Sequence, residues 1–422
     1  MPELEHPINV QTEVTEDCNH RCFYCYNSGR SEFEDSKKMS VENAKEIGQK
    51  IVEDVKPFNA TITGGEPMLN MPAFLTLLEI FKRNGLNPGV NTNLTLADRN
   101  RLEQIRQINP KTRFLVSVPS IDPVVFQEIT GKQNLGKVLQ NLETLVSLGF
   151  GSSVNIVTNR LNVDSVYQAG KFLNQHYGIQ SISTTPALKP SLADCDSSKF
   201  LGVEGILHGT QQLLKLREDL GMKISVLTVL PYCMIPEEWR KINIFRRGCS
   251  AGRTSIQVGY DGEIRSCGHS PFSEGNLLEE PFSKIWEKME PYGADKYIPK
   301  ECGDCSEVEY CKGGCRFEGL GETEKLDRPD PRMRSILKTH FSPTLESLDP
   351  DKLYEFNPFK TRQEGPGVYT LYNGQVFTTT KATKKFIDEI KGIGFRLNSF
   401  PDKLRPVAHS IGQKLKHKGF LK

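Results

Sequence analysis

The feature that most constrains the fold is an alternation of strand-like and helix-like segments through residues 1–190. Strands are expected at Ile8–Thr15, Ala60–Thr63, Gly89–Thr92, Arg113–Val118, Ser153–Val157 and Ile179–Thr184. Helices are expected at Lys37–Asp54, Pro72–Arg83, Leu96–Gln107, Leu135–Leu148 and Val163–His176. Such units predict an α/β fold, a parallel sheet covered by helices. A closed TIM barrel has eight strands, so the pattern predicts an open, partial (β/α)6 TIM-like barrel with its chemistry at the C-terminal strand ends.

A tight cysteine loop follows the first expected strand. Cys18, Cys22 and Cys25 have the spacing C-x3-C-x2-C. Three thiolates this close can each bind one iron of a 4Fe–4S cluster, which leaves the fourth iron without a protein ligand. A zinc knuckle is the alternative, but zinc prefers four ligands and no fourth cysteine completes this group. His20 lies inside the motif and is expected to point away.

Polar or glycine-rich motifs follow several of the other expected strands. Consecutive glycines let a backbone approach a ligand closely, and a neighbouring carboxylate can accept hydrogen bonds from an ammonium group. The residues concerned are Gly64, Gly65, Glu66 and Pro67 after the second strand, Asn91 and Asn93 at the third, Ser117 in the fourth and Asn155 in the fifth. A glycine turn and satisfied polar groups at strand ends are the alternative interpretation.

Together the cysteine loop and the Gly-Gly-Glu-Pro motif resemble the radical S-adenosylmethionine (SAM) superfamily. The resemblance implies that a reduced 4Fe–4S cluster transfers one electron to SAM, which splits into methionine and a 5′-deoxyadenosyl radical. It also implies that Gly64 to Pro67 hold the amino group of SAM. Asn91, Asn93, Ser117 and Asn155 would lie near the methionyl and ribose portions. No catalytic acid or base is predicted.

A second group of cysteines lies between residues 249 and 315. Cys249 is separated by twelve residues from Gly262 and then by four from Cys267, and Asp261-Gly262 predicts a β-hairpin between them. A closer run follows, with the spacing Cys302-x2-Cys305-x5-Cys311-x3-Cys315. A zinc ribbon is the alternative for this run, because paired cysteines at short spacing suit zinc.

This second group resembles the SPASM domain, the auxiliary-cluster module of peptide-modifying radical SAM enzymes, over residues 249–333. The resemblance implies two auxiliary 4Fe–4S clusters, one on Cys249, Cys267 and Cys315 and the other on Cys302, Cys305 and Cys311. Family members usually carry a seventh cysteine after the run. Met333 stands where that cysteine often lies.

The missing cysteine leaves the fourth ligands open. Asp330 is the candidate oxygen ligand, because some relatives use an aspartate there, and Asp327 is the second choice. Cys233 is the candidate upstream ligand of the first auxiliary cluster; without it, that cluster would have an open iron able to bind substrate. Cys195 is isolated and is expected to be a small buried apolar residue.

The C-terminal seventy residues carry no metal motif. A hairpin is expected at Gly367–Leu371 and Gln375–Thr379, followed by helices at Lys381–Lys391 and Val407–Lys418. This order resembles a small α+β, winged-helix-like domain of the PqqD type, which implies binding of a precursor's leader peptide. A generic winged helix that binds nucleic acid or packs on the barrel is the alternative.

Charge supports an acidic partner for this last segment. Residues 351–422 hold 14 Lys and Arg against 6 Asp and Glu, whereas the rest of the chain holds 40 against 46. The excess of +8 could attract an acidic ligand, and a solvated basic surface is the alternative. The expected domains are therefore the barrel (1–190), a helical connection (191–248), the SPASM domain (249–345) and the recognition domain (346–422).

Composition indicates a cytoplasmic protein. No apolar run is long enough to span a membrane, and the acidic N-terminus is not a signal peptide. The 11 cysteines cluster at short spacings, which favours metal ligation over disulfides. The resemblances imply SAM and 4Fe–4S clusters as cofactors, and a precursor peptide with a leader and a flavodoxin or ferredoxin as partners, with no membrane and no nucleic acid.

The function implied is post-translational modification of a ribosomally made peptide. The product would be a thioether, a C–C or C–O cross-link, or a backbone rearrangement. An anaerobic sulfatase maturase that forms formylglycine is one alternative. A metal-stabilised binding protein without catalysis is another.

Overall fold

A computed structural model describes residues 4–27, 37–189, 196–245, 247–293, 295–320, 325–338, 345–373 and 375–422. The chain divides into two compact units. One comprises Pro7–His340, and the other combines Met1–His6 with Phe341–Lys422. Within the described residues, no helix has the length and apolar character that crossing a membrane requires.

One large sheet organises the unit Pro7–His340. Its described strands run in the order β10-β9-β8-β1-β2-β3-β4-β5-β6-β7, and β1 to β8 pair in parallel. The strands are β1 (Asn9–Glu13), β2 (Asn59–Thr63), β3 (Gly89–Thr92), β4 (Arg113–Ser117), β5 (Gly151–Thr158), β6 (Ser181–Pro186), β7 (Lys223–Val226), β8 (Ser255–Val258), β9 (Glu263–Arg265) and β10 (Gly275–Asn276). The six predicted parallel strands are confirmed, and β7 and β8 extend them at the two ends.

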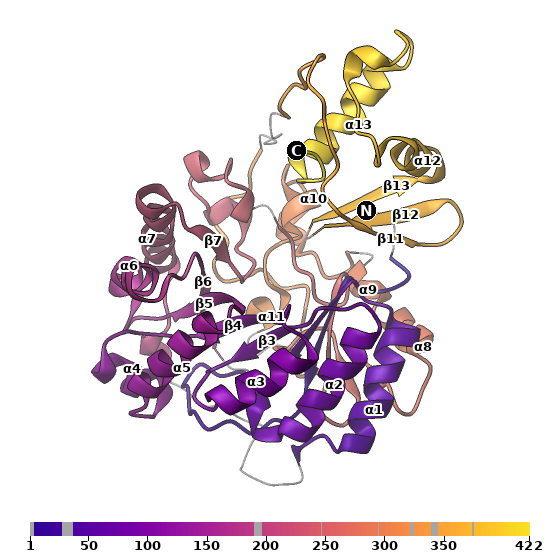
Figure 1. Cartoon of the computed structure of the whole chain (residues 1–422). Helices are drawn as coiled ribbons and strands as arrows, with labels where there is room; N and C mark the ends of the chain where they lie inside the picture. The colour runs from indigo at the N-terminus through magenta and orange to yellow at the C-terminus, as the bar shows by residue number, and fades with distance from the viewer. Residues whose placement is uncertain are drawn as a thin grey trace. The chain divides into compact units, whose positions relative to one another are not determined.

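Helices connect and cover these strands, and Figure 1 shows α1, α2 and α3 side by side along them. Helices of the unit are α1 (Val41–Lys50), α2 (Met71–Arg83), α3 (Arg99–Ile108), α4 (Pro123–Thr130), α5 (Leu135–Ser147), α6 (Val166–Tyr177), α7 (Val203–Leu220), α8 (Phe282–Lys288), α9 (Glu290–Gly293), α10 (Val308–Cys311) and α11 (Arg316–Leu320). Several begin at side-chain caps, such as Ser40 at α1 and Asp98 at α3. Helix α7 lies in the segment 191–248, which was expected to be a helical connection, whereas strand β7 in the same segment was not foreseen.

The two faces of the sheet differ sharply in polarity. Register partners on one face are apolar and buried, as in Val90 beside Phe114 and Val154 beside Ile182. The side chain of Ile182 lies against Gly170 of α6, so this face carries helices. The other face pairs polar residues, including Asn155 with both Ser117 and Ser183. Parallel sheets are normally apolar on both faces, so the polar face indicates a site for polar ligands.

The cysteine-rich segment is joined to the barrel through the same sheet. Strand β8 pairs in parallel with β1, and β9 folds back on β8 through the turn at Asp261 and Gly262. Gly262 has φ 89°, a conformation that favours glycine. The predicted hairpin is confirmed, and the expected parts 1–190, 191–248 and 249–345 share one sheet.

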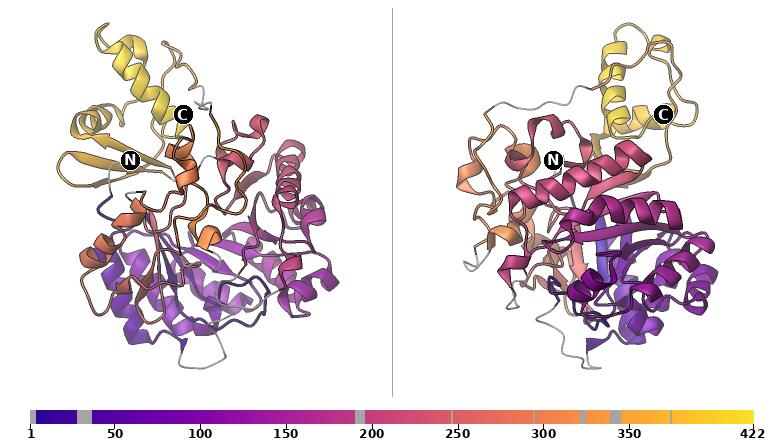
Figure 2. Two further views of the ribbon diagram at one scale, coloured as in Figure 1. Left: turned by 180° about the vertical axis from the view of Figure 1, so that it is seen from behind. Right: turned by 90° about the vertical axis from the view of Figure 1, so that its left-hand side faces the viewer.

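The unit Met1–His6 with Phe341–Lys422 contains a small antiparallel sheet (Figures 1 and 2). Strands β11 (Lys360–Gln363), β12 (Val368–Tyr372) and β13 (Val376–Thr380) lie in that order, followed by α12 (Lys381–Ile390) and α13 (Arg405–His417). Its core includes Tyr354, Leu371, Ile387, Leu415 and Phe420. The expected hairpin and both helices are present, and β11 was not foreseen. Gly374 of the expected turn lies outside the described residues.

Candidate functional site

The loop that carries Cys18, Cys22 and Cys25 follows β1 and is half-buried. The backbone N–H of Cys25 donates to the carbonyl of Cys22 at 3.0 Å, which closes a tight turn. Burial and the other two thiolates raise the pKa of Cys22 above its ordinary value. Burial likewise raises the pKa of Cys18 and of Cys25, so binding of a metal must release thiol protons.

His20 does not take part in this group of thiols. Its Nε2 hydrogen-bonds Oδ1 of Asn134 at 3.1 Å, and its ring packs edge-on against Phe126. Burial lowers the pKa of His20 to about 4, so the ring is neutral at physiological pH. The expectation that His20 points away is confirmed.

The Gly64-Gly65-Glu66-Pro67 segment, here called the GGEP loop, docks directly on the chain that leads into the cysteine loop. The N–H of Gly65 donates to the carbonyl of Thr15 at 2.8 Å, and that of Glu66 donates to Asp17 at 2.7 Å. A Cβ on Gly65 would lie 2.1 Å from the carbonyl oxygen of Asp17. The glycines thus allow close approach to a neighbouring backbone, whereas the sequence suggested approach to a ligand. Pro67 begins a short 3-10 turn, Pro67–Asn70.

Glu66 ties the GGEP loop to the end of β3 and to the cysteine loop. Its fully buried carboxylate accepts from the Thr92 hydroxyl at 2.9 Å and from the Asn93 N–H at 2.8 Å. The Asn93 amide then reaches Sγ of Cys18 at 3.7 Å and Oδ1 of Asn19 at 2.8 Å. Burial raises the pKa of Glu66 to about 7. Asn93 therefore links Glu66 to the cysteine loop, and Thr92, which was not among the predicted site residues, adds a second bond to the carboxylate.

The other predicted polar residues lie on the polar face of the sheet. Asn155 accepts hydrogen bonds from the hydroxyls of Ser183 and Thr185, both at 3.0 Å. Ser117 is the register partner of Asn155, and Asn91 pairs with Leu115 two residues earlier in the same strand. The strand register places these residues on the same face of the sheet.

A buried ion pair on this face was missed. Glu13 is fully buried and pairs with Arg265 of β9, itself 3% exposed, and it accepts from the Tyr26 hydroxyl at 3.2 Å. Burial raises the pKa of Glu13, while Arg265 opposes that effect. The pair joins β1 to the cysteine-rich hairpin, and burial together with the Glu13 charge raises the pKa of Cys25. The sequence feature that could have revealed this ion pair is Glu13 itself, a charged residue within the expected strand Ile8–Thr15.

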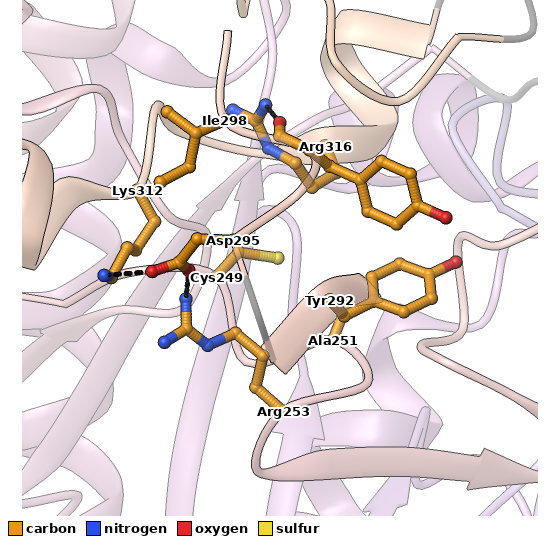
Figure 3. Close-up of a pocket in the computed structure, with 9 residues that line it drawn as sticks. Cys249, Ala251, Arg253, Tyr292, Asp295, Ile298, Lys312 and Arg316 are labelled. Carbon is orange, nitrogen blue, oxygen red and sulfur yellow. Dashed lines mark hydrogen bonds and ion pairs between the residues drawn. The ribbon is translucent and has the colours of Figure 1, made fainter. Parts of the chain in front are cut away.

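The later cysteines form two sets. Burial, followed by the charges of Cys249 and Cys315, raises the pKa of Cys267, so these three thiols lie together. Beside Cys249 is a pocket whose lining includes three cationic side chains (Figure 3). Arg253 and Lys312 both pair with Asp295 at 2.5 Å.

The second set contains four cysteines. Cys233, Cys302, Cys305 and Cys311 line one apolar hollow. Burial raises the pKa of Cys302 to about 12, with further contributions from the charges of Cys311, Cys305 and Cys233. The structure therefore places Cys233 with this set, and not with Cys249 as the sequence suggested. Cys195 lies outside the described residues.

Asp330, the predicted oxygen ligand, is fully buried and bonded elsewhere. Its oxygens accept from the Arg332 guanidinium at 2.6 and 2.8 Å and from the Cys315 N–H at 2.9 Å. Asp330 is not among the residues that line the hollow with Cys302, Cys305 and Cys311. The geometry thus argues against its predicted role, and Asp327, the second choice, is not in that lining either.

Single-ion sites are not found in the part of the chain that the structure describes. No three His, Cys, Asp or Glu side chains there converge closely enough to hold one metal ion. A zinc ion binds its sulfurs at about 2.3 Å, whereas a 4Fe–4S cluster spreads its thiolates over separate irons.

Comparisons with known proteins agree with this geometry. A model of the radical SAM superfamily matches residues 12–173, and a model of the SPASM iron–sulfur cluster-binding domain matches residues 249–315. The mycofactocin maturase MftC of Mycolicibacterium smegmatis is 26% identical over 353 residues, covering 78% of this chain and 83% of the relative. The AdoMet-dependent heme synthase of Methanosarcina barkeri is 22% identical over 342 residues, covering 77% and 95%.

Solved structures show the same fold. The crystal structure of Streptococcus suis SuiB bound to S-adenosylmethionine matches with a TM-score of 0.64 at 16% identity, covering 78% of this chain and 77% of that one. The family matches include the cysteine loop and the later cysteines from Cys249 to Cys315, whereas Cys233 lies outside both matches. This chain is therefore a radical SAM enzyme with a SPASM iron–sulfur domain, related to the peptide maturases.

Proposed function

We propose that this enzyme modifies a ribosomally made precursor peptide and that its C-terminal unit binds the leader. The observation that carries the proposal is the small sheet of that unit, in which β13 is an outer strand within the described residues. An extended peptide can add to such an edge by main-chain hydrogen bonds. Two relatives support the idea, since MftC is named a maturase and SuiB has been solved bound to its precursor peptide SuiA.

The leader is proposed to pair with β13 rather than with β11. At β11, Arg362 donates to the carbonyl of His6 at 2.7 Å, and Glu364 accepts from the N–H of Glu5 at 3.1 Å. The N-terminal segment therefore already lies beside this strand. Strand β13 leads directly into α12, and its residues are half-buried or exposed.

Charge favours an acidic leader. Helix α12 begins with Lys381, Lys384 and Lys385, next to the end of β13. Residues 351–422 carry a net charge of +8. Charge attraction speeds encounter and weakens with salt.

In the barrel, the residues of the chain would bind and shield the reacting groups. When bound, a reduced 4Fe–4S cluster and SAM supply a 5′-deoxyadenosyl radical that abstracts a substrate hydrogen. Cys18, Cys22 and Cys25 would hold the cluster, while Glu66 and Asn93 brace the loops around it. The polar face with Asn155 would orient SAM and substrate, and the helices on the opposite face close the barrel wall.

The electron would come from a small redox protein such as a flavodoxin or ferredoxin. We also propose a cytoplasmic location. The described cysteines are free thiols grouped as metal ligands, which suits a reducing compartment.

The proposal is tested by mass spectrometry. The full chain is expressed anaerobically with each short open reading frame adjacent to its gene, and peptide masses are compared with and without SAM and dithionite. We expect a mass change in one peptide that needs both reagents, and weaker binding of the same peptide without its leader. If no peptide changes while a sulfatase-type Cys peptide gains formylglycine, or a porphyrin precursor is consumed as the name of the heme-synthase relative would suggest, the proposal is wrong.

A further inference from the structure

We propose that Cys233 is the fourth protein ligand of the auxiliary cluster on Cys302, Cys305 and Cys311. It would take the place of the seventh cysteine that this chain lacks. The inference concerns the metal centre alone and is independent of the substrate.

The turn that carries Cys233 is fixed directly against this set. Cys233 lies in the 3-10 turn Tyr232–Met234. The N–H of Tyr232 donates to Sγ of Cys311 at 3.3 Å, so the residue before Cys233 touches a neighbouring ligand. The Tyr232 hydroxyl, donating to the carbonyl of Arg240 at 2.7 Å, anchors the turn. Cys233 is therefore held in place by contacts on both sides.

The segment where a seventh cysteine is expected runs past the same hollow. Met333 lies 4.0 Å from Cys302, sulfur to sulfur. The next residue, Arg334, donates its N–H to Sγ of Cys233 at 3.3 Å. Backbone N–H groups directed at ligand sulfurs are a common feature of iron–sulfur sites and tune their potential. Met333 thus places a neutral thioether where the family's seventh cysteine usually lies, and the turn Tyr232–Met234 supplies the thiol of Cys233.

The hollow itself offers no competing ligand. It has about 310 Å³ of empty space, partly open to solvent. Besides the four cysteines, its lining is apolar or backbone: Pro231, Tyr232, Val308, Gly313, Met333 and Ile336. No carboxylate or imidazole is among these lining residues. A thiolate binds iron far better than a thioether, which leaves Cys233 as the fourth ligand.

Asp330 is not needed as a cluster ligand, because its carboxylate is already hydrogen-bonded. Its carboxylate is saturated by Arg332 and by the backbone of Cys315, which belongs to the other set. Using it as a ligand would break a buried ion pair and leave the Arg332 charge buried without its partner. With Cys233 assigned, the described cysteines leave Cys249, Cys267 and Cys315 as a three-thiolate set.

The test uses the full chain with Cys18, Cys22 and Cys25 changed to Ala, so that only auxiliary clusters contribute. Iron and sulfide content and the reduced electron paramagnetic resonance (EPR) spectrum are measured after reconstitution. We expect Cys233→Ala to alter or remove the same signal as Cys302→Ala, with loss of up to about four irons. The double variant should lose no more than either single one. Met333→Leu and Asp330→Asn should leave that signal unchanged.

Cys233→Ser keeps the side-chain volume and offers oxygen, so it should retain iron with a shifted signal. A wild-type spectrum and iron content in both Cys233 variants would overturn the proposal. So would a change confined to the signal that Cys249→Ala affects.

Discussion

Replacing Gly65 with alanine should separate the GGEP loop from the cysteine loop. The added Cβ would lie 2.1 Å from the carbonyl oxygen of Asp17 and 2.4 Å from that of Glu16. Non-bonded heavy atoms normally sit at about 3.5–4.0 Å. The obstacles are backbone atoms that cannot rotate away, so the GGEP loop itself must move by more than about 1 Å.

The cost follows from what that movement breaks. The hydrogen bonds from Gly65 to Thr15 and from Glu66 to Asp17 would lengthen, and each contributes about 0.5–1.5 kcal/mol. Overpacking adds about 1–3 kcal/mol. The free energy of unfolding should therefore fall by about 2–6 kcal/mol. Because the Glu66 and Asn93 network moves with the loop, SAM affinity should fall at least about tenfold, which is about 1.4 kcal/mol.

The assay compares the melting temperature and SAM affinity of anaerobic Gly65→Ala with those of Gly136→Ala. Gly136 lies in α5, where an added Cβ meets no atom within 4 Å. Alanine favours a helix over glycine by up to about 1 kcal/mol, so this control should be neutral or stabilised. A Gly65→Ala protein with wild-type stability and SAM affinity would refute the reasoning.

Two further predictions concern buried carboxylates. Burial raises the pKa of Glu66 to about 7, above the ordinary 4.5, so its charge is lost as pH falls below 7. If this charge stabilises the ammonium group of SAM, SAM affinity should rise between pH 6 and pH 7, by a factor approaching tenfold per pH unit, and should level off above pH 7. Equilibrium dialysis measures this affinity. The Glu66→Gln variant should show no such pH dependence. Glu13→Gln leaves Arg265 buried without its partner and should cost about 3–5 kcal/mol of unfolding free energy. Adding Arg265→Met should recover part of that loss, and purely additive effects in chemical denaturation would contradict the coupling.

The sequence predicted the parts of the site that depend on local spacing. The cysteine loop, the GGEP loop and the polar residues on β3, β4 and β5 all follow from strand order, because parallel strands end at one edge of the sheet. The structure adds a reason for the glycines that the sequence did not supply. Their contact is with the backbone of Thr15 to Asp17, which no local pattern reveals.

The other features of the site depend on contacts between residues far apart in the sequence, which local patterns do not reveal. Strand β8 joins β1 across more than two hundred residues, and the ion pair of Glu13 with Arg265 depends on that pairing. In the sequence, Cys233 was the candidate upstream ligand of the first auxiliary cluster. Folding brings Cys233 to Cys302 and Cys311 instead, because its turn is bonded to Cys311 and to the segment after Met333. The sequence predicted that Asp330 is an oxygen ligand of a cluster. The folded structure shows that its carboxylate accepts a hydrogen bond from Arg332.

The central claim is that this chain carries a SAM-cleaving cluster on Cys18, Cys22 and Cys25 and two more clusters on the later cysteines. The most direct measurement is iron and sulfide per chain after anaerobic reconstitution, in the wild type and with those three cysteines changed to Ala. The account predicts about twelve irons falling to about eight, with loss of 5′-deoxyadenosine formation under dithionite. About four irons falling to none, with zinc retained, would contradict it and make the later cysteines a structural zinc site.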